Sequence, residues 1–212
     1  MYVPSHFKED RVPVLHEAIA KAGLATLVTF GPAGLDASHV PMLLDRESGP
    51  LGTLYGHIAR PNPQWRGAAP DLLALAVFVG PDAYVTPSWY ATKQRTGEVV
   101  PTWNYVAVHA HGRVRFFDDP ERLLGLVTKL TEVREAARPK PWAVGDAPDE
   151  YIRAHLKGII GFELPIERLE GKWKMSQNRS AEDRTGVAEG LEREGGEVGA
   201  SVAVLVRGAP VI

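Results

Sequence analysis

The sequence predicts a mainly β protein with helices, an α+β fold organised as an antiparallel barrel. Its 21 glycines and 17 prolines, among 212 residues, interrupt many short apolar runs, which is typical of strands joined by tight turns. Helical spacing is confined to a few segments, and these do not alternate with strands as in a parallel α/β sheet. Neither an internal repeat nor a linker between two domains is found, so we expect a single domain over residues 1–212.

The first half of the chain begins with a helix and continues with strands. Residues 11–22 carry apolar side chains at helical spacing, with Pro13 in the first turn and Gly23 where the helix should stop. Six runs with strand character follow, and the last alternates for much of its length. They are residues 24–30, 37–44, 53–57, 72–79, 83–86 and 103–117.

Two further helices are expected in the middle of the chain. Asp119 and Pro120 form a start signal for a helix that reaches Val133. A shorter helix is expected over residues 148–156. Together they predict a helical insertion at about residues 119–157.

The C-terminal part returns to strand character and then ends in a helix. Residues 159–164 are apolar, and the pattern continues toward Trp173. Ser180 and Asp183 match a capping box, which predicts a helix start at this point. A last apolar run occupies residues 201–206.

Composition excludes several classes of site. The chain has no cysteine, which excludes a disulfide, a thiolate nucleophile and a cysteine-ligated metal centre. Its 24 basic and 26 acidic residues give a net charge of −2, which argues against a non-specific DNA binder. The longest apolar run, residues 72–79, is about half as long as a membrane-spanning helix, and residues 1–10 lack a signal-peptide profile. We therefore expect a cytoplasmic protein that does not enter a membrane.

The segment around Arg60 is the most informative. A strand ends at His57, Arg60 follows, and Asn62 with Pro63 forms a strong helix start. Free N–H groups at a helix start attract an anion, and an arginine can hold a phosphate with two parallel hydrogen bonds. This combination suits the phosphate monoester of a cofactor. The alternative is that Arg60 pairs with a surface carboxylate and that His57 fills a gap in the core.

Two other segments offer binding side chains. Residues 84–90 and 100–105 are dense in aromatic residues and asparagine, which suits a planar ring, although aromatic pairs across strands also stabilise cores. Lys174, Gln177 and Arg179 form a second polar wall for an anion or a ring edge; the alternative is a solvated turn.

The histidines do not predict a metal site. His109 and His111 should face the same side of a strand, but no third ligand is evident before Asp118, so we expect no metal. His39 is interpreted as a hydrogen-bonded structural residue. Sequence motifs for mononucleotide loops, zinc proteases and nucleophile elbows are absent.

Taken together, six segments resemble the PaiB-like family of FMN-binding negative transcriptional regulators, in order and over nearly the whole chain. They are Tyr2-Val3-Pro4 with Phe7, Gly56-His57-Ile58-Ala59-Arg60 with Asn62-Pro63-Gln64-Trp65, Pro87-Ser88-Trp89-Tyr90, Val100-Pro101-Thr102-Trp103-Asn104-Tyr105, Lys157-Gly158-Ile159-Ile160-Gly161-Phe162, and Leu169-Glu170-Gly171-Lys172 running into Ser176-Gln177-Asn178-Arg179.

The resemblance implies a split β-barrel shared with pyridoxamine-phosphate oxidases and flavin reductases. It implies a homodimer that holds FMN in clefts at the subunit interface. The cofactor-binding residues that follow are Arg60 and Asn62 at the phosphate, His57 and His39 near the flavin or its ribityl chain, Trp103 and Tyr105 beside the ring, and Lys174, Gln177 and Arg179 from the C-terminal segment. The resemblance assigns no catalytic residue.

A regulatory role is the first functional hypothesis, exerted on DNA or indirectly through a metabolite or a partner. If the chain contacts DNA, basic residues should carry the contact; these are Arg113, Arg115, Arg134, Arg138 and Lys140. The first alternative is a flavin-dependent oxidoreductase or flavin reductase acting on a small substrate, in which a histidine donates a proton. The second alternative is a haem or other tetrapyrrole binder, by analogy of fold.

Overall fold

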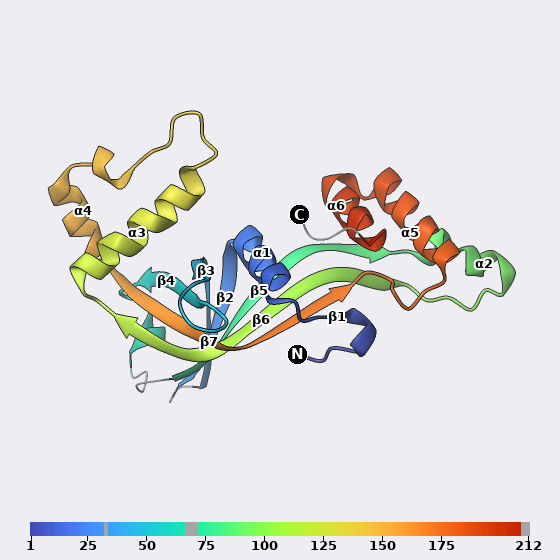
Figure 1. Ribbon diagram of the computed structural model, residues 1–212, viewed down its shortest axis with the longest axis horizontal. Coiled ribbons are helices and arrows are strands. Elements are labelled where there is room, and N and C mark those ends of the chain that lie inside the picture. Colours follow the sequence, from blue (N-terminus) through green and yellow to red (C-terminus); the bar gives the residue numbers. More distant parts are fainter. Residues whose placement is uncertain (32–33, 67–71, 209–212) are drawn as a thin grey trace. The chain divides into compact units, whose positions relative to one another are not determined.

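The computed structural model describes residues 1–31, 34–66 and 72–208. The chain forms two compact units. Unit 1 comprises Met1–Ala22, Phe78–His109 and Leu169–Ile212, and unit 2 comprises Gly23–Val77 and Ala110–Arg168. Three long strands contribute residues to both units: β5 (Leu72–Val85), β6 (Thr102–Phe117) and β7 (Ile159–Lys174), traced in Figure 1. The expectation of a single domain stays a prediction.

The strands form one antiparallel sheet whose order closes on itself. Unit 2 contains β2 (Leu24–Gly31), β3 (Gly34–Asp45) and β4 (Thr53–Ala59). The order is β1-β7-β4-β3-β2-β5-β6, and β6 also pairs with β7. The register places Thr26 opposite His39 and His57 opposite Gly161. The predicted mainly β fold with helices is confirmed.

Strand β5 corrects one detail of the prediction. Two strands were expected, with a break between residues 79 and 83, but β5 is continuous through Gly80 and Pro81. Gly80 lies against β6 so closely that a Cβ atom there would be 2.9 Å from Cβ of Val106. Glycine therefore serves close strand packing at this position rather than a turn.

Unit 2 carries the expected helical insertion. It consists of α3 (Pro120–Glu135), a 3₁₀ turn η4 (Val144–Asp146) and α4 (Asp149–Leu156). Asp119 caps α3 by accepting the N–H of Arg122 at 2.8 Å. The apolar face of α3 buries Leu123, and Gly161 of β7 permits this contact, since a Cβ there would lie 3.0 Å from the leucine.

The other helices belong to unit 1. They are α1 (Val12–Ala22), α2 (Ala91–Arg95), α5 (Ala181–Glu194) and α6 (Gly196–Val206), with 3₁₀ turns η1 (Ser5–Phe7) and η3 (Pro87–Trp89) and strand β1 (Lys8–Glu9). The predicted helix start is confirmed, because Ser180 Oγ accepts the N–H of Asp183 at 3.2 Å. The second hydrogen bond of a capping box is replaced, because the Asp183 carboxylate accepts hydrogen bonds from Thr92. Residues 201–206 form the second half of α6. Within the part of the chain that is described, no helix combines the length and apolar character needed to cross a bilayer.

The core of unit 1 lies between its strands and α5 with α6. Its buried members include residues from β5, the residue after η3, β6, the segment after β7 and both helices: Val85, Tyr90, Val106, Met175, Val187, Leu191, Val202 and Val206. Trp89 packs against this cluster from the side of η3. The alternation of buried and exposed residues along β5 and β6 places aromatic side chains on the opposite face.

Candidate functional site

Arg60 follows directly after β4 and is held by backbone carbonyls of unit 2. Its Nε donates to the carbonyl oxygen of Lys157 at 2.7 Å, and its Nη2 donates to that of Ile159 at 3.3 Å. Its Nη1 lies 3.4 Å from a carboxylate oxygen of Asp118, and the side chain is 35% exposed. These contacts use three of the five N–H donors of a guanidinium. The charge is thus oriented by the fold while part of its donor capacity remains for a ligand.

The turn after Arg60 differs from the prediction. A helix was expected from Asn62, but the structure has a single 3₁₀ turn, η2 (Pro63–Trp65). Pro63 has no N–H, and the N–H of Gln64 is taken by Asn62 Oδ1 at 2.9 Å. The indole of Trp65 donates back to the carbonyl of Arg60 at 3.0 Å, and the chain leaves the turn in an extended conformation. A helix dipole therefore does not assist Arg60 in holding an anion.

Asn62 and Gln64 tie this turn to the β2–β3 hairpin. Asn62 Nδ2 donates to Ser38 Oγ at 2.8 Å. Gln64 is buried, and its Nε2 donates to the carbonyl of Leu27 at 3.0 Å and to Thr29 Oγ1 at 3.1 Å. The sequence offered no signal for Gln64 beyond its place after Asn62 and Pro63, because both acceptors are far away in the chain.

The two histidines of unit 2 have different surroundings. His39 shares a hydrogen bond of 3.0 Å with Thr26 Oγ1 through its Nδ1. His57 Nδ1 is buried and has no hydrogen-bond partner in the described part of the chain. Burial lowers the pKa of His57 below its ordinary value of 6.5. Its imidazole is therefore neutral at pH 7, and its buried nitrogen has hydrogen-bonding capacity that the described residues do not use.

The other five predicted residues belong to unit 1. Trp103 is about half exposed and meets Tyr84 edge to face at 5.9 Å between ring centroids. Lys174 Nζ donates to Thr102 Oγ1 and, at 2.6 Å, to the carbonyl of Trp103. Burial, with the positive charges of Lys172 and Arg179, lowers the pKa of Lys174.

Of the C-terminal residues of the predicted set, Gln177 bonds within its own segment and Arg179 contacts a distant aromatic ring. Gln177 donates to the carbonyl of Trp173 at 2.6 Å and accepts the N–H of Met175 at 2.7 Å. The guanidinium of Arg179 lies 4.9 Å from the ring centroid of Tyr90.

The nine predicted residues thus fall into two sets. Unit 2 holds His39, His57, Arg60 and Asn62, and unit 1 holds Trp103, Tyr105, Lys174, Gln177 and Arg179. Within unit 1, Lys174 and Trp103 are in direct contact. Their assignment to FMN stays a prediction for both sets.

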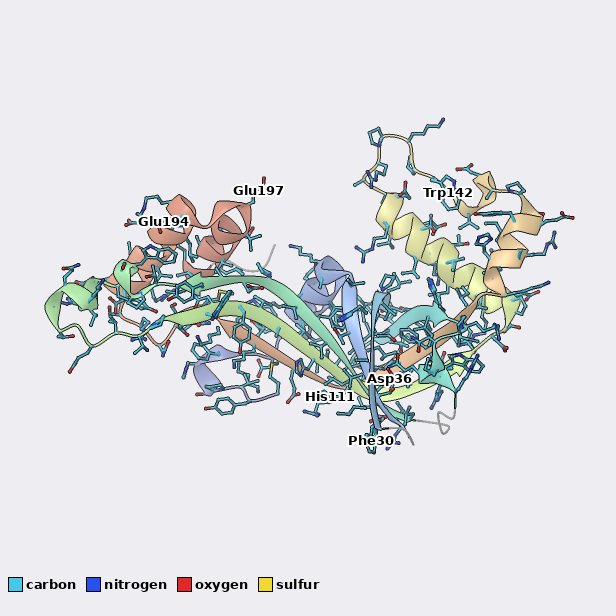
Figure 2. The ribbon with its side chains drawn as sticks, turned by 180° about the vertical axis from the view of Figure 1, so that it is seen from behind. Phe30, Asp36, His111, Trp142, Glu194 and Glu197 are labelled. Carbon is cyan, nitrogen blue, oxygen red and sulfur yellow. The ribbon has the colours of Figure 1, made fainter. Side chains whose placement is uncertain are left out.

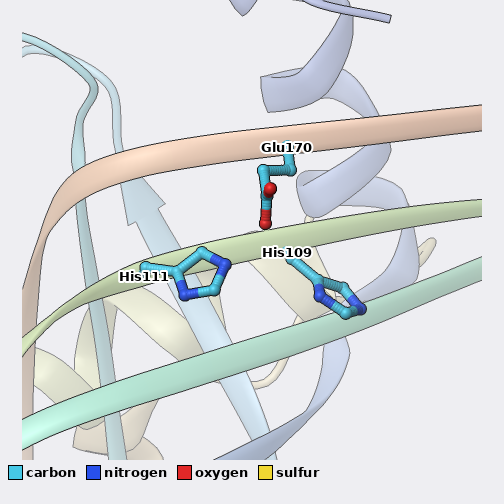
Figure 3. Close-up of side chains that lie close together, drawn as sticks. All are labelled: His109, His111 and Glu170. Carbon is cyan, nitrogen blue, oxygen red and sulfur yellow. The ribbon is translucent and has the colours of Figure 1, made fainter. Parts of the chain in front are cut away.

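Figure 3 shows the histidine pair of β6 with Glu170 of β7, an acidic residue that is distant in the sequence and that sequence spacing did not predict beside them. Two of these three residues already have interaction partners within their own unit. In unit 1, Glu170 accepts the N-terminal ammonium of Met1 at 2.9 Å, and in unit 2, Arg168 lies 3.1 Å from Nδ1 of His111. We assign no metal to these residues.

Comparison with known proteins identifies relatives across most of the chain. A family model described as "Putative FMN-binding domain" matches residues 1–168. The "Protease synthase and sporulation protein PAI 2" of Bacillus subtilis is 32% identical, over 92% of this chain and 90% of that protein. An uncharacterized protein of Aspergillus fumigatus is 38% identical, over 98% and 97% of the two chains.

Two solved structures with the same fold are of proteins named for redox cofactors. The FAD and haem binding protein from Mycobacterium smegmatis superposes with a TM-score of 0.59 at 15% identity, covering 86% of this chain and 80% of its own. The flavocytochrome Anf3 from Azotobacter vinelandii also gives 0.59, at 12% identity, covering 87% and 78%. At these identities the likeness shows the fold alone, which agrees with the predicted split barrel.

Proposed function

Because the chain belongs to the family described as "Putative FMN-binding domain", we propose that it is an FMN-binding homodimer with a regulatory role, and that Arg60 holds the FMN phosphate. Membership of this family confirms both the cofactor and the PaiB-like resemblance predicted from the sequence. FMN supplies redox chemistry when bound, and the protein supplies binding and orientation.

The observation that carries the phosphate assignment is the anchoring of the Arg60 guanidinium by two backbone carbonyls. Its position is set before a ligand arrives, so little side-chain entropy is lost on binding. Asp118 is the only carboxylate that pairs with Arg60 in the described residues, at 3.4 Å, and it is 67% exposed. An incoming phosphate can replace so weak a partner.

Ser38 and His57 complete the proposed site in unit 2. Ser38 Oγ accepts a hydrogen bond from Asn62, which leaves its own O–H to donate to the phosphate or the ribityl chain. His57 lies in β4, the strand that ends just before Arg60, and we place it near the flavin or its ribityl chain.

The test is retention of FMN through gel filtration by the full chain. The wild type should stay yellow, and Arg60→Ala should lose most of the flavin while riboflavin affinity changes little. Arg153→Ala is the matched control, since Arg153 is an exposed arginine of α4 in a surface ion pair of 3.5 Å. A colourless wild type, or an Arg60→Ala protein as yellow as wild type, contradicts the proposal.

Dimerisation is supported by an apolar groove on unit 2. The groove has a volume of about 440 Å³ and is lined in part by Phe30, Leu35 and Leu73, which are 61–77% exposed. Phe30 is labelled in Figure 2, with Asp36 of the facing strand. Glu167 and Arg168 also line the groove, beside these apolar side chains. Exposed apolar patches of this kind mark interaction sites.

Light scattering after gel filtration tests the dimer. Leu73→Asp should convert it to a monomer, and Val198→Asp, at an exposed valine of α6, should leave it dimeric. A monomeric wild type contradicts this part of the proposal.

The relationship to PAI 2, a protein named for protease synthesis and sporulation, supports the proposed regulatory role. We propose the cytoplasm as its location, because a regulator of genes acts there. Indirect action is favoured over DNA contact because basic residues suggested for DNA pair with acids: Arg113 with Glu167 at 3.4 Å and Arg115 with Glu163 at 3.9 Å. A gel-shift assay with random competitor DNA tests this. A stable, sequence-dependent shift would show direct binding.

A further inference from the structure

A cavity in unit 2 is lined by one face of α3 and by three strands. Its volume is about 570 Å³, which is within the range of small-molecule sites. The strands contribute Leu43, Leu44 and Asp45 of β3, Tyr55 of β4 and Phe117 of β6. None of the nine described residues that were predicted to bind FMN lines this cavity.

Gly125 lies in the middle of the α3 face that lines the cavity. The lining residues of α3 share this face, because they recur at helical spacing. They are Arg122, Gly125, Leu126, Lys129, Glu132 and Val133. A glycine inside a helix is destabilising relative to alanine. Neither packing nor backbone geometry requires this one: no described atom lies within 4 Å of a Cβ placed there, and its φ is not positive. The glycine leaves the cavity open.

The strand side of the cavity is apolar and incompletely covered. Leu43, Leu44 and Phe117 line it and are only partly buried, as is the ring of Tyr55. On the helix side, Leu126 is buried. An apolar group of a ligand would remove the partly exposed side chains from water, which favours binding. The cavity therefore suits a ligand with an apolar body.

Two charged residues of the lining already have partners. Arg122 donates to Glu163 at 2.8 Å, and its guanidinium lies 3.9 Å from the ring centroid of Phe117. Asp45 accepts the backbone N–H of Glu47 at 3.1 Å. These contacts hold the walls of the cavity in place.

Lys129 and Glu132 are available to a ligand. Both are exposed, which places them at the rim of the cavity, and neither side chain forms a hydrogen bond or an ion pair with the described residues. They are three positions apart on one face of α3, so a positive and a negative charge lie side by side. A compound that carries both a carboxylate and an ammonium group would match both charges, whereas a simple acid or amine would match one.

We propose that this cavity binds an apolar α-amino acid. Its carboxylate is held by Lys129, its ammonium group by Glu132, and its side chain lies beside Gly125 in the apolar part of the cavity. The inference goes beyond the proposed function, because this binding requires neither flavin at Arg60 nor a second copy of the chain.

Calorimetric titration of the full chain tests the proposal with L-leucine and L-phenylalanine. Each is compared with the analogue that lacks its ammonium group, 4-methylpentanoate or 3-phenylpropanoate, and with the analogue that lacks its carboxylate, 3-methylbutylamine or 2-phenylethylamine. At least one amino acid should bind about fivefold more tightly than both of its analogues. Binding of neither amino acid, or equal binding of each amino acid and one of its analogues, overturns the proposal.

Lys129→Met tests the carboxylate contact, because it keeps the apolar stem and removes the charge. It should weaken binding of the amino acid by about fivefold and leave binding of the amine analogue unchanged. Lys140→Met is the matched control, since Lys140 is exposed in the segment after α3 and does not line the cavity. Equal affinities of Lys129→Met and Lys140→Met for the amino acid contradict the proposal.

Gly125→Leu separates a binding role from a structural one. The added side chain should occupy the cavity, so amino-acid binding should fall by about tenfold or more, while the melting temperature stays at or above that of the wild type because a helix-interior glycine is removed. A lower melting temperature with unchanged binding would show that the glycine serves packing, and it overturns the proposal. Lys129→Met carries the test if Gly125→Leu does not fold.

FMN retention distinguishes this inference from the proposed function. Gly125→Leu and Lys129→Met should retain FMN as the wild type does, and Arg60→Ala should bind the amino acid as the wild type does. Loss of flavin from a stable Gly125→Leu protein would assign the cavity to FMN and overturn the inference. Loss of flavin confined to Arg60→Ala leaves the proposed function standing, whatever the amino-acid titration shows.

Discussion

The Asp183 carboxylate accepts two hydrogen bonds from Thr92, one from its backbone N–H at 2.9 Å and one from its hydroxyl at 2.8 Å. Asp183 is the third residue of α5, and Thr92 lies in α2. The pair therefore joins two helices through residues that are 91 positions apart in the chain. It fixes the segment after Trp89 and Tyr90, one of the segments that carries the family resemblance.

Asp183→Asn should destabilise the protein and change its response to acid. Burial opposes ionisation of Asp183, but the hydrogen bonds from Thr92 and Ser180 outweigh it, so the pKa is held below its ordinary 3.8. The carboxylate therefore stabilises the fold above pH 3.8, and this contribution is lost as the pH falls below that value. We expect Asp183→Asn to lower the free energy of unfolding at pH 7 by about 1–3 kcal/mol and to flatten its acid dependence. Urea unfolding at several pH values measures both, with exposed Asp82→Asn as the control; equal acid slopes in wild type and Asp183→Asn contradict the prediction.

Asp118→Asn should increase FMN affinity. The Asp118 carboxylate occupies the Arg60 guanidinium at 3.4 Å and would compete with a phosphate. Exposed ion pairs of this kind are worth about 0.2–1 kcal/mol, so the dissociation constant should fall by up to about fivefold. Flavin fluorescence titration measures it. Asp149→Asn, which removes a similar surface pair with Arg153, should have no effect. Weaker FMN binding by Asp118→Asn would contradict the prediction, because it would mean that Asp118 contributes to FMN binding.

Gly186→Ala and Gly190→Ala should destabilise α5. A Cβ atom at Gly190 would lie 2.5 Å from Cγ of Trp89, and one at Gly186 would overlap the Trp89 carbonyl oxygen. We expect losses of about 1–3 kcal/mol, larger at Gly186, where backbone rather than a side chain must move. Gly125→Ala is the control, because nothing lies within 4 Å of that position in α3, and it should stabilise by up to about 1 kcal/mol. Chemical denaturation measures the free energy of unfolding of all three variants. A gain in stability for Gly186→Ala would contradict the close contact between Gly186 and the Trp89 backbone.

Because His57 stays neutral in the folded protein, the free energy of unfolding should fall as the pH drops below 6.5. Burial lowers the pKa of His57 below 6.5, so the unfolded chain takes up a proton that the folded protein does not. Stability is then lost as the pH falls from 6.5 toward the folded pKa. His57→Gln should remove this part of the pH dependence, and exposed His155→Gln should not. The urea midpoint between pH 7.5 and 5.5 measures the effect; an unchanged slope in His57→Gln contradicts it.

Local patterns predicted most of the elements. The helix starts at Asp119 and Ser180 were found because a cap involves residues only three positions apart. Patterns failed where a distant contact intervened. Asn62 and Pro63 have the composition of a helix start, yet bonds from Trp65 and Gln64 end the turn at once. Gly80 reads as a turn residue, yet the approach of Val106 requires it within a strand.

The sequence alone determined most of the strands and the starts of the main helices, because periodicity and caps involve neighbouring residues. Its ordered motifs indicated the family and the flavin cofactor by resemblance. Only the tertiary structure decided the partner of each charge. Arg60 reaches carbonyls 97 and 99 positions away, and Lys172 is buried among rings from distant parts of the chain. Burial and hydrogen-bond partners depend on contacts between remote segments, and these arise only when the sheet closes.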